Sequence, residues 1–183
     1  MGLVRVTSPF DLAFIFIFAH ALEVVPNMIN RLFLDDEDMV DQIWRLQHMA
    51  YRLEAERIGF RDIPPLMDTH ETIRKCKEDF YGCLNEDGEL IGAVATEQEA
   101  PDTITISRMM VHPGHFRKGI AGSLIQHVLD LHPDVPLFIV STGTKNTPAV
   151  ALYTKYGFVP FDRYEVAPGV ELTTFHRASE SSQ

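Results

Sequence analysis

The fold is decided by the stretch VHPGHFRKGIAGSL, residues 111–124. Just before it, residues 103–111 alternate in polarity and then turn apolar, which predicts a strand in the middle of a sheet. Just after the loop, apolar residues recur at helical spacing as far as Leu129, and residues 136–140 form the apolar run of a buried strand. The quoted stretch therefore predicts the loop and helix start of a βαβ unit.

The loop of this unit, residues 112–121, has the composition of an anion-binding turn. Gly119 and Ala121 would let a ligand come close to the main chain. The start of the helix carries a partial positive charge, and Arg117 and Lys118 add full charges, so a pyrophosphate suits the loop. A plain turn with incidental basic residues and a different phosphate ligand both stay open. The glycines form neither a Gly-Lys-Ser/Thr loop end nor G-x-G-x-x-G, so ATP and dinucleotides are not supported.

The rest of the chain predicts further helices and strands. Acidic caps, helical spacing, Asp-Gly turn chemistry and well-placed glycines and prolines mark their limits. They are a helix over residues 35–58, a second helix from Thr69, a hairpin over 80–96 with its turn at 85–88, a helix from Pro148 to Gly157, and strands over 158–166 and 170–176.

Composition indicates one globular, acidic domain. The chain has 183 residues, and its 16 Lys and Arg against 26 Asp and Glu give a net charge of −10, so we expect no nucleic-acid partner. The apolar run at residues 12–19 is shorter than the roughly 20 residues a membrane helix needs, so we expect no membrane partner. Cys76 and Cys83 match neither a disulfide framework nor a zinc motif, which favours a reducing, cytoplasmic compartment. His112 and His115 lack H-E-x-x-H spacing, and we expect no metal.

The chain divides into an N-terminal extension, a domain and a tail. Residues 1–27 loosely imitate a signal peptide, but a strand-like segment follows Met28, so the extension could instead be an upstream-start artefact. Deleting residues 1–27 is then expected to leave solubility and ligand affinity nearly unchanged. The domain is expected over residues 28–176, and residues 177–183 form a polar tail.

A second motif supports the anion-binding loop. Residues 146–158, NTPAVALYTKYGF, resemble the Asn-x-x-Ala-x-x-x-Tyr-x-x-x-Gly-Phe signature of the GNAT acetyltransferase family. Residues 116–121, FRKGIA, resemble that family's acetyl-CoA loop, in which Arg or Gln precedes two residues, Gly, one residue, and Gly or Ala. Phe116 departs from the pattern, because it stands where the family carries a polar or basic residue, and Arg117 comes one position later. Both motifs occur in the family's order, and the resemblance covers residues 28–176.

The resemblance implies a GNAT-like α/β fold: a mixed, mostly antiparallel sheet with helices on both faces and the βαβ unit at a splay that admits the cofactor. It implies acetyl-CoA as co-substrate and direct transfer of the acetyl group to an amine acceptor, a small molecule or a peptide. It implies Tyr153 as the general acid that protonates the leaving CoA thiolate. The cofactor-binding residues it implies are Met110, Val111, Phe116, Arg117, Lys118, Gly119, Ile120, Ala121, Gly122 and Asn146.

Several alternatives stay open. Apart from the resemblance, the residues favour Tyr153 as a core aromatic in an amphipathic helix. Arg108, a charge inside an apolar strand, could reach the acceptor or pair with a nearby acid. No general base is assigned, because each candidate carboxylate could be an ordinary solvated surface group; the candidates are Glu54, Glu56, Glu97 and Glu99. The alternative function is a non-catalytic acyl-CoA-binding sensor or interaction module. The oligomeric state of the protein stays open, with a homodimer as one option.

Overall fold

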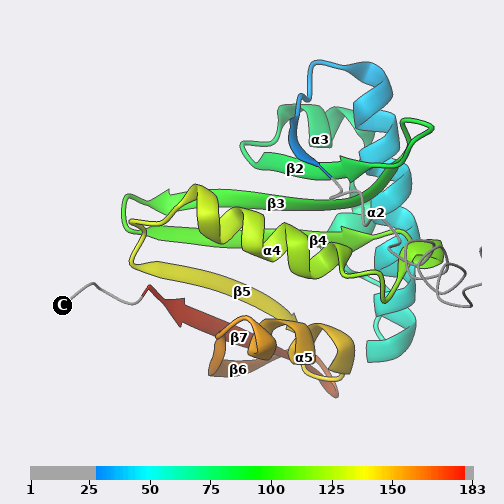
Figure 1. Cartoon of the computed structure of the whole chain (residues 1–183). Coiled ribbons are helices and arrows are strands. Elements are labelled where there is room, and N and C mark those ends of the chain that lie inside the picture. The colour runs from blue at the N-terminus through cyan, green and yellow to red at the C-terminus, as the bar shows by residue number, and fades with distance from the viewer. Residues whose placement is uncertain (1–27, 180–183) are drawn as a thin grey trace, which may run out of the picture.

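The computed structural model describes residues 28–179, which form one seven-stranded sheet flanked by helices (Figure 1). Its elements are β1 (Ile29–Leu32), α2 (Glu37–Ile58), η2 (Pro64–Met67), α3 (His70–Lys75), β2 (Asp79–Leu84), β3 (Leu90–Ala100), β4 (Thr103–Val111), η3 (Pro113–His115), α4 (Ile120–Leu131), β5 (Leu137–Gly143), α5 (Thr147–Lys155), β6 (Val159–Ala167) and β7 (Val170–Ala178). The strand order is β1-β2-β3-β4-β5-β7-β6, so β4 is central, as the sequence predicts. The expected mixed, mostly antiparallel sheet is confirmed, with β4 and β5 as its parallel pair.

β4 and β5 separate along their length. Their ladder joins only four residue pairs, from Thr103 with Leu137 to Ile106 with Val140. The pairing of β3 with β4 shifts by one residue directly afterwards, which leaves Ser107 as a bulge. A bulge bends the strand that carries it, so β4 turns away from β5 after Ile106. We call the resulting opening, between residues 107–111 and the end of β5, the splay.

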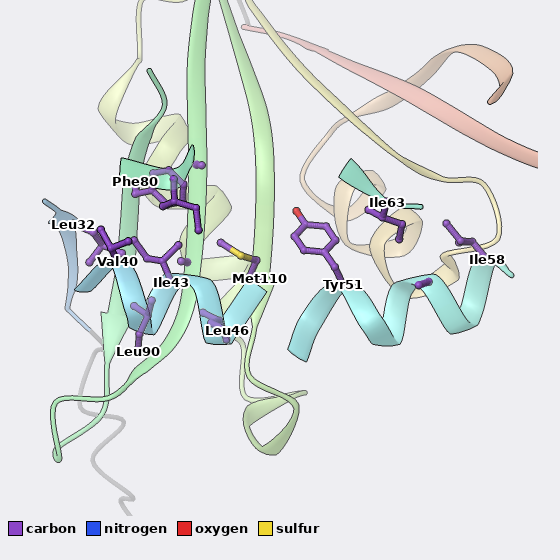
Figure 2. Packing of buried hydrophobic residues seen from close by; sticks show 14 of the residues in the cluster. Leu32, Val40, Ile43, Leu46, Tyr51, Ile58, Ile63, Phe80, Leu90 and Met110 are labelled. Atoms are coloured by element: carbon purple, nitrogen blue, oxygen red, sulfur yellow. The ribbon is translucent and has the colours of Figure 1, made fainter. Parts of the chain in front are cut away.

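Hydrophobic cores lie on opposite faces of this sheet. On one face, α2 packs against β3 and β4 and buries Ile43 and Leu46 beside Met110 (Figure 2). On the other face, α4 packs against the same two strands and buries Leu124 in a cluster with Phe138. In Figure 1, α5 covers the β6–β7 end of the sheet on the same side as α4. Helices therefore cover both faces, as expected.

The helix ends follow the predicted caps. The Asp36 side chain accepts hydrogen bonds from the N–H groups of Asp38 and Met39 at the start of α2, and Gly59, with φ 73°, ends that helix. Thr69 caps α3. Between α2 and α3, Pro64 and Pro65 begin the 3-10 turn η2. The φ angle of proline is fixed near the helical value, which suits the first turn of a helix. These caps hold the segment between α2 and α3 in a defined place beside the sheet.

The C-terminal strand is longer than the sequence indicates. β7 continues to Ala178 rather than ending at residue 176, and Arg177 Nε donates to the Tyr156 carbonyl at 3.0 Å. The predictions for residues 1–27 lie outside the described residues. No helix within residues 28–179 is long and apolar enough to cross a membrane.

Candidate active site

The loop between β4 and α4 presents main-chain N–H groups. Arg117 and Gly119 both adopt left-handed conformations, with φ 64° and 83°, which is uncommon for arginine. α4 starts directly after Gly119, and its first helical hydrogen bond is donated by Ser123 N to the Gly119 carbonyl. The N–H groups of residues 120–122 therefore precede the helical ladder and face away from it. Such a turn at a helix N-terminus forms a positively polarised concavity for an anion.

A cavity of about 360 Å³ adjoins this turn, and we call it the loop cavity. The turn and the first residues of α4 form one side of it, and Met109 and Val111 of β4 form the floor beside them. Asn146, the N-cap of α5, and Leu152, within that helix, lie on another side, and Glu54 of α2 completes the wall. The turn before α4, which the sequence predicts to bind an anion, therefore lies at one end of a cavity that reaches the splay.

A second cavity of about 450 Å³ lies in the splay itself, and we call it the splay cavity. Residues 107–109 of β4 and 141–143 of β5 line it, together with residues from α2, η2, α5 and the β6–β7 hairpin. Five residues line both cavities: Glu54, Met109, Asn146, Ala149 and Leu152. The two cavities are therefore neighbours, and a ligand extended from the anion-binding turn would enter the second one.

Buried tyrosines from opposite faces of the sheet meet in the splay cavity. Tyr51 projects from α2 and Tyr153 from α5, and they are 8% and 4% exposed. In Figure 2 the Tyr51 hydroxyl points away from α2, between the Met110 group and the Ile58–Ile63 group. Burial, and then proximity to Tyr51 and Glu54, raises the pKa of Tyr153 well above its usual range. The Tyr153 phenol is therefore protonated, and able to donate, throughout the physiological pH range.

A short chain of hydrogen bonds positions Glu54 at the junction of the cavities. The Asn146 amide donates to Thr142 Oγ1 at 3.3 Å, and Thr142 Oγ1 donates to Glu54 Oε1 at 3.1 Å. Glu54 also contributes to the raised pKa of Tyr51, after burial itself. Because the hydrogen bond from Thr142 occupies one carboxylate oxygen of Glu54, the other oxygen is available to a ligand in either cavity.

Arg108 pairs with acids, which decides between the alternatives the sequence left open. Its Nε donates to both oxygens of Glu78, at 3.0 and 2.9 Å, and its Nη1 donates to Asp68 and to Gln47. The side chains of Arg108, Glu78 and Asp68 are only 12%, 9% and 18% exposed. Desolvation acts to raise the pKa of Asp68, but hydrogen bonds from Arg108, Thr72 and Gln47 outweigh it and lower that pKa.

The same network anchors η2 beside the splay cavity. The buried Gln47 side chain donates to the Pro65 carbonyl and, at 3.0 Å, to Asp68. Trp44 Nε1 donates to the Asp68 carbonyl at 3.0 Å. Arg108 therefore lines the splay cavity, while its positive charge is paired with the carboxylates of Asp68 and Glu78.

Most of the predicted cofactor-binding residues line the loop cavity, and Tyr153 lines the splay cavity. The Met110 side chain is fully buried against α2, so only its main chain could face a ligand, whereas the neighbouring Met109 lines both cavities. Lys118 is exposed and does not line the loop cavity. The residues that line the loop cavity are Val111, Phe116, Arg117, Gly119, Ile120, Ala121, Gly122 and Asn146.

Sequence reasoning did not single out Tyr51, Thr142 or a particular carboxylate. Tyr51 and Glu54 are three residues apart on one helix and therefore share a face. This spacing was the one feature of the sequence that could have pointed to them as a pair. Glu97 is exposed and lines neither cavity. Thr142 carried no signal, because a threonine in a strand is ordinary.

The two histidines of the loop, His112 and His115, lie beside each other. His112 Nδ1 accepts a hydrogen bond from Gly114 N at 3.1 Å, and the His112 and His115 rings meet edge to face. His115 lines the loop cavity, and its Nδ1 is shielded without a partner among the described residues. Within residues 28–179, no group of three or more His, Cys, Asp or Glu side chains could hold a metal ion.

The fold therefore combines a splayed sheet with two adjoining cavities, one beside the turn before α4 and the other beside a buried phenol. The Acetyltransferase (GNAT) family matches residues 40–158. The chain therefore belongs to the GNAT acetyltransferase family, whose members are acyltransferases that generally use acetyl-CoA.

Individual proteins show the same likeness. Over 149 residues the chain is 38% identical to UPF0157 protein YqkA of Bacillus subtilis, covering 81% of this chain and 43% of that protein, so it spans less than half of that relative's length. Among solved structures, smu.2055 of Streptococcus mutans superposes with a TM-score of 0.68 at 19% identity, covering 84% of this chain and 99% of that one. The ribosomal-protein-S18-alanine N-acetyltransferase of Escherichia coli superposes with a TM-score of 0.65 at 16% identity, covering 85% and 96%. At these identities the structures show a shared fold.

Proposed function

We propose that the chain is an acetyl-CoA-dependent N-acetyltransferase in which Tyr153 is the general acid. The observation that carries this is the adjoining of two cavities. One contains the anion-binding turn, and the other contains a buried, protonated phenol. Family membership supports acetyl transfer in general, and the geometry supports these roles for the residues of this chain.

The loop cavity suits the cofactor. The pyrophosphate of acetyl-CoA would lie against the N–H groups of residues 120–122, with Arg117 adding a full positive charge. Phe116, which is 40% exposed and lines this cavity, would contact the cofactor by its ring rather than by an ion pair. The acyl end would then reach the junction where Asn146 and Met109 line both cavities.

In the reaction, the acceptor nitrogen attacks the thioester carbonyl carbon, and a main-chain N–H near the end of β4 stabilises the charge on the carbonyl oxygen. The new C–N bond forms as the C–S bond breaks. The Tyr153 hydroxyl gives its proton to the departing sulfur, and Glu54 takes the proton that the nitrogen loses. Transfer of one proton from Glu54 to Tyr153 restores both groups, so the products are an N-acetyl amine and CoA.

Glu54 suits the role of base by its position. It lines both cavities and lies close enough to both phenols to raise their pKa values. Thr142 fixes one of its oxygens, which leaves the other for the amine. The acid and the base thus belong to α5 and α2, on opposite sides of the splay.

Replacing Tyr153 by Phe tests this assignment. The change removes one oxygen from a packed ring, so we expect turnover to fall by about 100-fold or more, the range for loss of a general acid. Acetyl-CoA affinity should stay unchanged, since Tyr153 does not line the loop cavity. Release of free thiol and binding titration measure the two quantities.

Tyr156→Phe is the matched control, because Tyr156 lies at the end of the same helix and lines neither cavity. It should keep its turnover. Full turnover of Tyr153→Phe across pH would contradict the role of Tyr153.

The departure at Phe116 favours one other function, an acyl-CoA-binding sensor without turnover. Such a protein would be stabilised by acetyl-CoA, by about 2.7 kcal/mol at 100 times its Kd, yet release no thiol with any amine. The thiol assay therefore separates the two functions.

A further inference from the structure

The wall of the splay cavity beyond Glu54 is apolar. Ile58, at the end of α2, and Ile63, just before η2, are both buried and line one side of it. Val166 and Leu172 line the other side, from the hairpin of β6 and β7. The acceptor therefore meets hydrocarbon on two sides once it has passed the cavity mouth.

The charges of this cavity are unbalanced. Its charged lining residues in the described part of the chain are Glu54, Asp62 and Arg108. Arg108 is bound to Glu78 and Asp68, so its charge is compensated outside the cavity. Glu54 has no ion pair with any described residue, and Asp62 is exposed near the mouth. The free charge facing a ligand is therefore negative.

We infer that the acceptor is a small primary amine with an apolar body and no carboxylate, an inference that rests on the proposed function. Its ammonium group would bind Glu54 and release one proton to solvent to give the neutral amine that attacks, and its body would pack between Ile63 and Leu172. An α-carboxylate on the same body would lie beside Glu54 with no unpaired cation among the described residues that line the splay cavity, and like charges in one site cost several kcal/mol.

The volume also sets a limit. About 450 Å³ falls within the roughly 300–1,000 Å³ typical of small-molecule sites. The cavity is walled by α2 and η2 on one side and by the β6–β7 hairpin on the other, so a longer acceptor would have to extend out of it into solvent. A compact amine matches both the negative charge of Glu54 and the space between the apolar walls.

The experiment compares acceptors matched in their body. Phenethylamine and phenylalanine differ only in the carboxylate, spermidine replaces the apolar body by further charges, and a tripeptide with N-terminal phenylalanine extends it. We expect kcat/KM for phenethylamine to exceed that of each of the other three by about 100-fold, the ratio for a difference of about 2.7 kcal/mol. Equal or higher kcat/KM for phenylalanine, spermidine or the tripeptide would overturn the inference.

A binding measurement separates this inference from the proposed function. Calorimetric titration of the CoA-loaded protein with the same four compounds needs no turnover. If no amine is acetylated, the proposed function fails, yet selective binding of phenethylamine would still support the acceptor class. Preferential binding of phenylalanine would reject the class even in an active enzyme.

A substitution in the wall gives an independent check. Val166 is 44% exposed at the edge strand, so Val166→Lys can place an ammonium group in the wall without disturbing the core. Val166→Lys should lower the ratio of kcat/KM for phenethylamine to kcat/KM for phenylalanine by about 10-fold. Val159→Lys, at a 60% exposed position on the same strand and outside the cavity, should leave that ratio unchanged. An unchanged ratio in Val166→Lys would count against the charge argument.

Discussion

Replacing Arg108 by Met should destabilise the protein strongly. Arg108 donates to Glu78, Asp68 and Gln47 and is 12% exposed, while its two acidic partners are 9% and 18% exposed. Met fills most of the volume but leaves two carboxylates without a cation. Removing one partner of a buried ion pair costs about 3–5 kcal/mol, and the slight exposure of Asp68 favours the lower end.

That cost corresponds to a readily measured shift. For a domain of this size each kcal/mol lowers Tm by roughly 2–4 °C, so about 3 kcal/mol predicts a fall of roughly 6–12 °C. Urea unfolding should show the same loss. Trp44, the single tryptophan, reports on this region directly, because its Nε1 donates to the Asp68 carbonyl at 3.0 Å.

The matched control is Arg31→Met. Arg31 pairs with Asp79 on the surface, where the side chains are 59% and 51% exposed, so the loss should stay below about 1 kcal/mol. Adding Glu78→Gln to Arg108→Met should recover part of the stability, because it removes an uncompensated charge. The reasoning is refuted if Arg108→Met unfolds within about 1 kcal/mol of the wild type. Loss of acceptor turnover at full stability would instead place Arg108 in substrate binding.

Two further predictions concern the loop cavity. A Cβ at Gly122 would lie 2.3 Å from the Tyr156 hydroxyl, so Gly122→Ala should cost about 1–3 kcal/mol in urea unfolding. Adding Tyr156→Phe should recover part of that loss, and no recovery would show that another contact is responsible. Desolvation, then Lys118 and His112, lowers the pKa of His115, which is therefore neutral at pH 7. A bound phosphate would raise this pKa, so CoA should bind with proton uptake, and its affinity should increase as pH falls below neutral. Calorimetric titration of His115→Gln with CoA should show a smaller change of affinity with pH than the wild type. If the change is the same in both proteins, His115 is not the group that takes up the proton.

The motifs that predicted the fold were those in which local chemistry decides conformation. The alternation over residues 103–111, the acidic cap before α2 and Gly59 after it all place elements where the structure has them. The extent of β7 was missed, because Arg177 looks like part of a polar tail until its pairing with the Tyr156 carbonyl is seen.

The site was predictable in one half only. The turn before α4 and Tyr153 lie within motifs of fixed spacing, so the sequence alone was enough to propose them as site residues. Glu54 and Thr142 are 88 residues apart and meet only because the splay admits side chains from both faces of the sheet. Nor could the sequence decide the role of Arg108, whose partner Glu78 lies 30 residues away.

Under the proposed function, the short ladder between β4 and β5 would couple the binding of the two ligands. Only four residue pairs join the two halves of the sheet through the main chain, and each cavity has walls from both halves. One opening angle therefore sets the shape of both cavities, and a ligand that fixes the angle prepares the site for the next. Such coupling would be reciprocal, so under the proposed function any factor by which CoA strengthens amine binding would equal the factor by which the amine strengthens CoA binding.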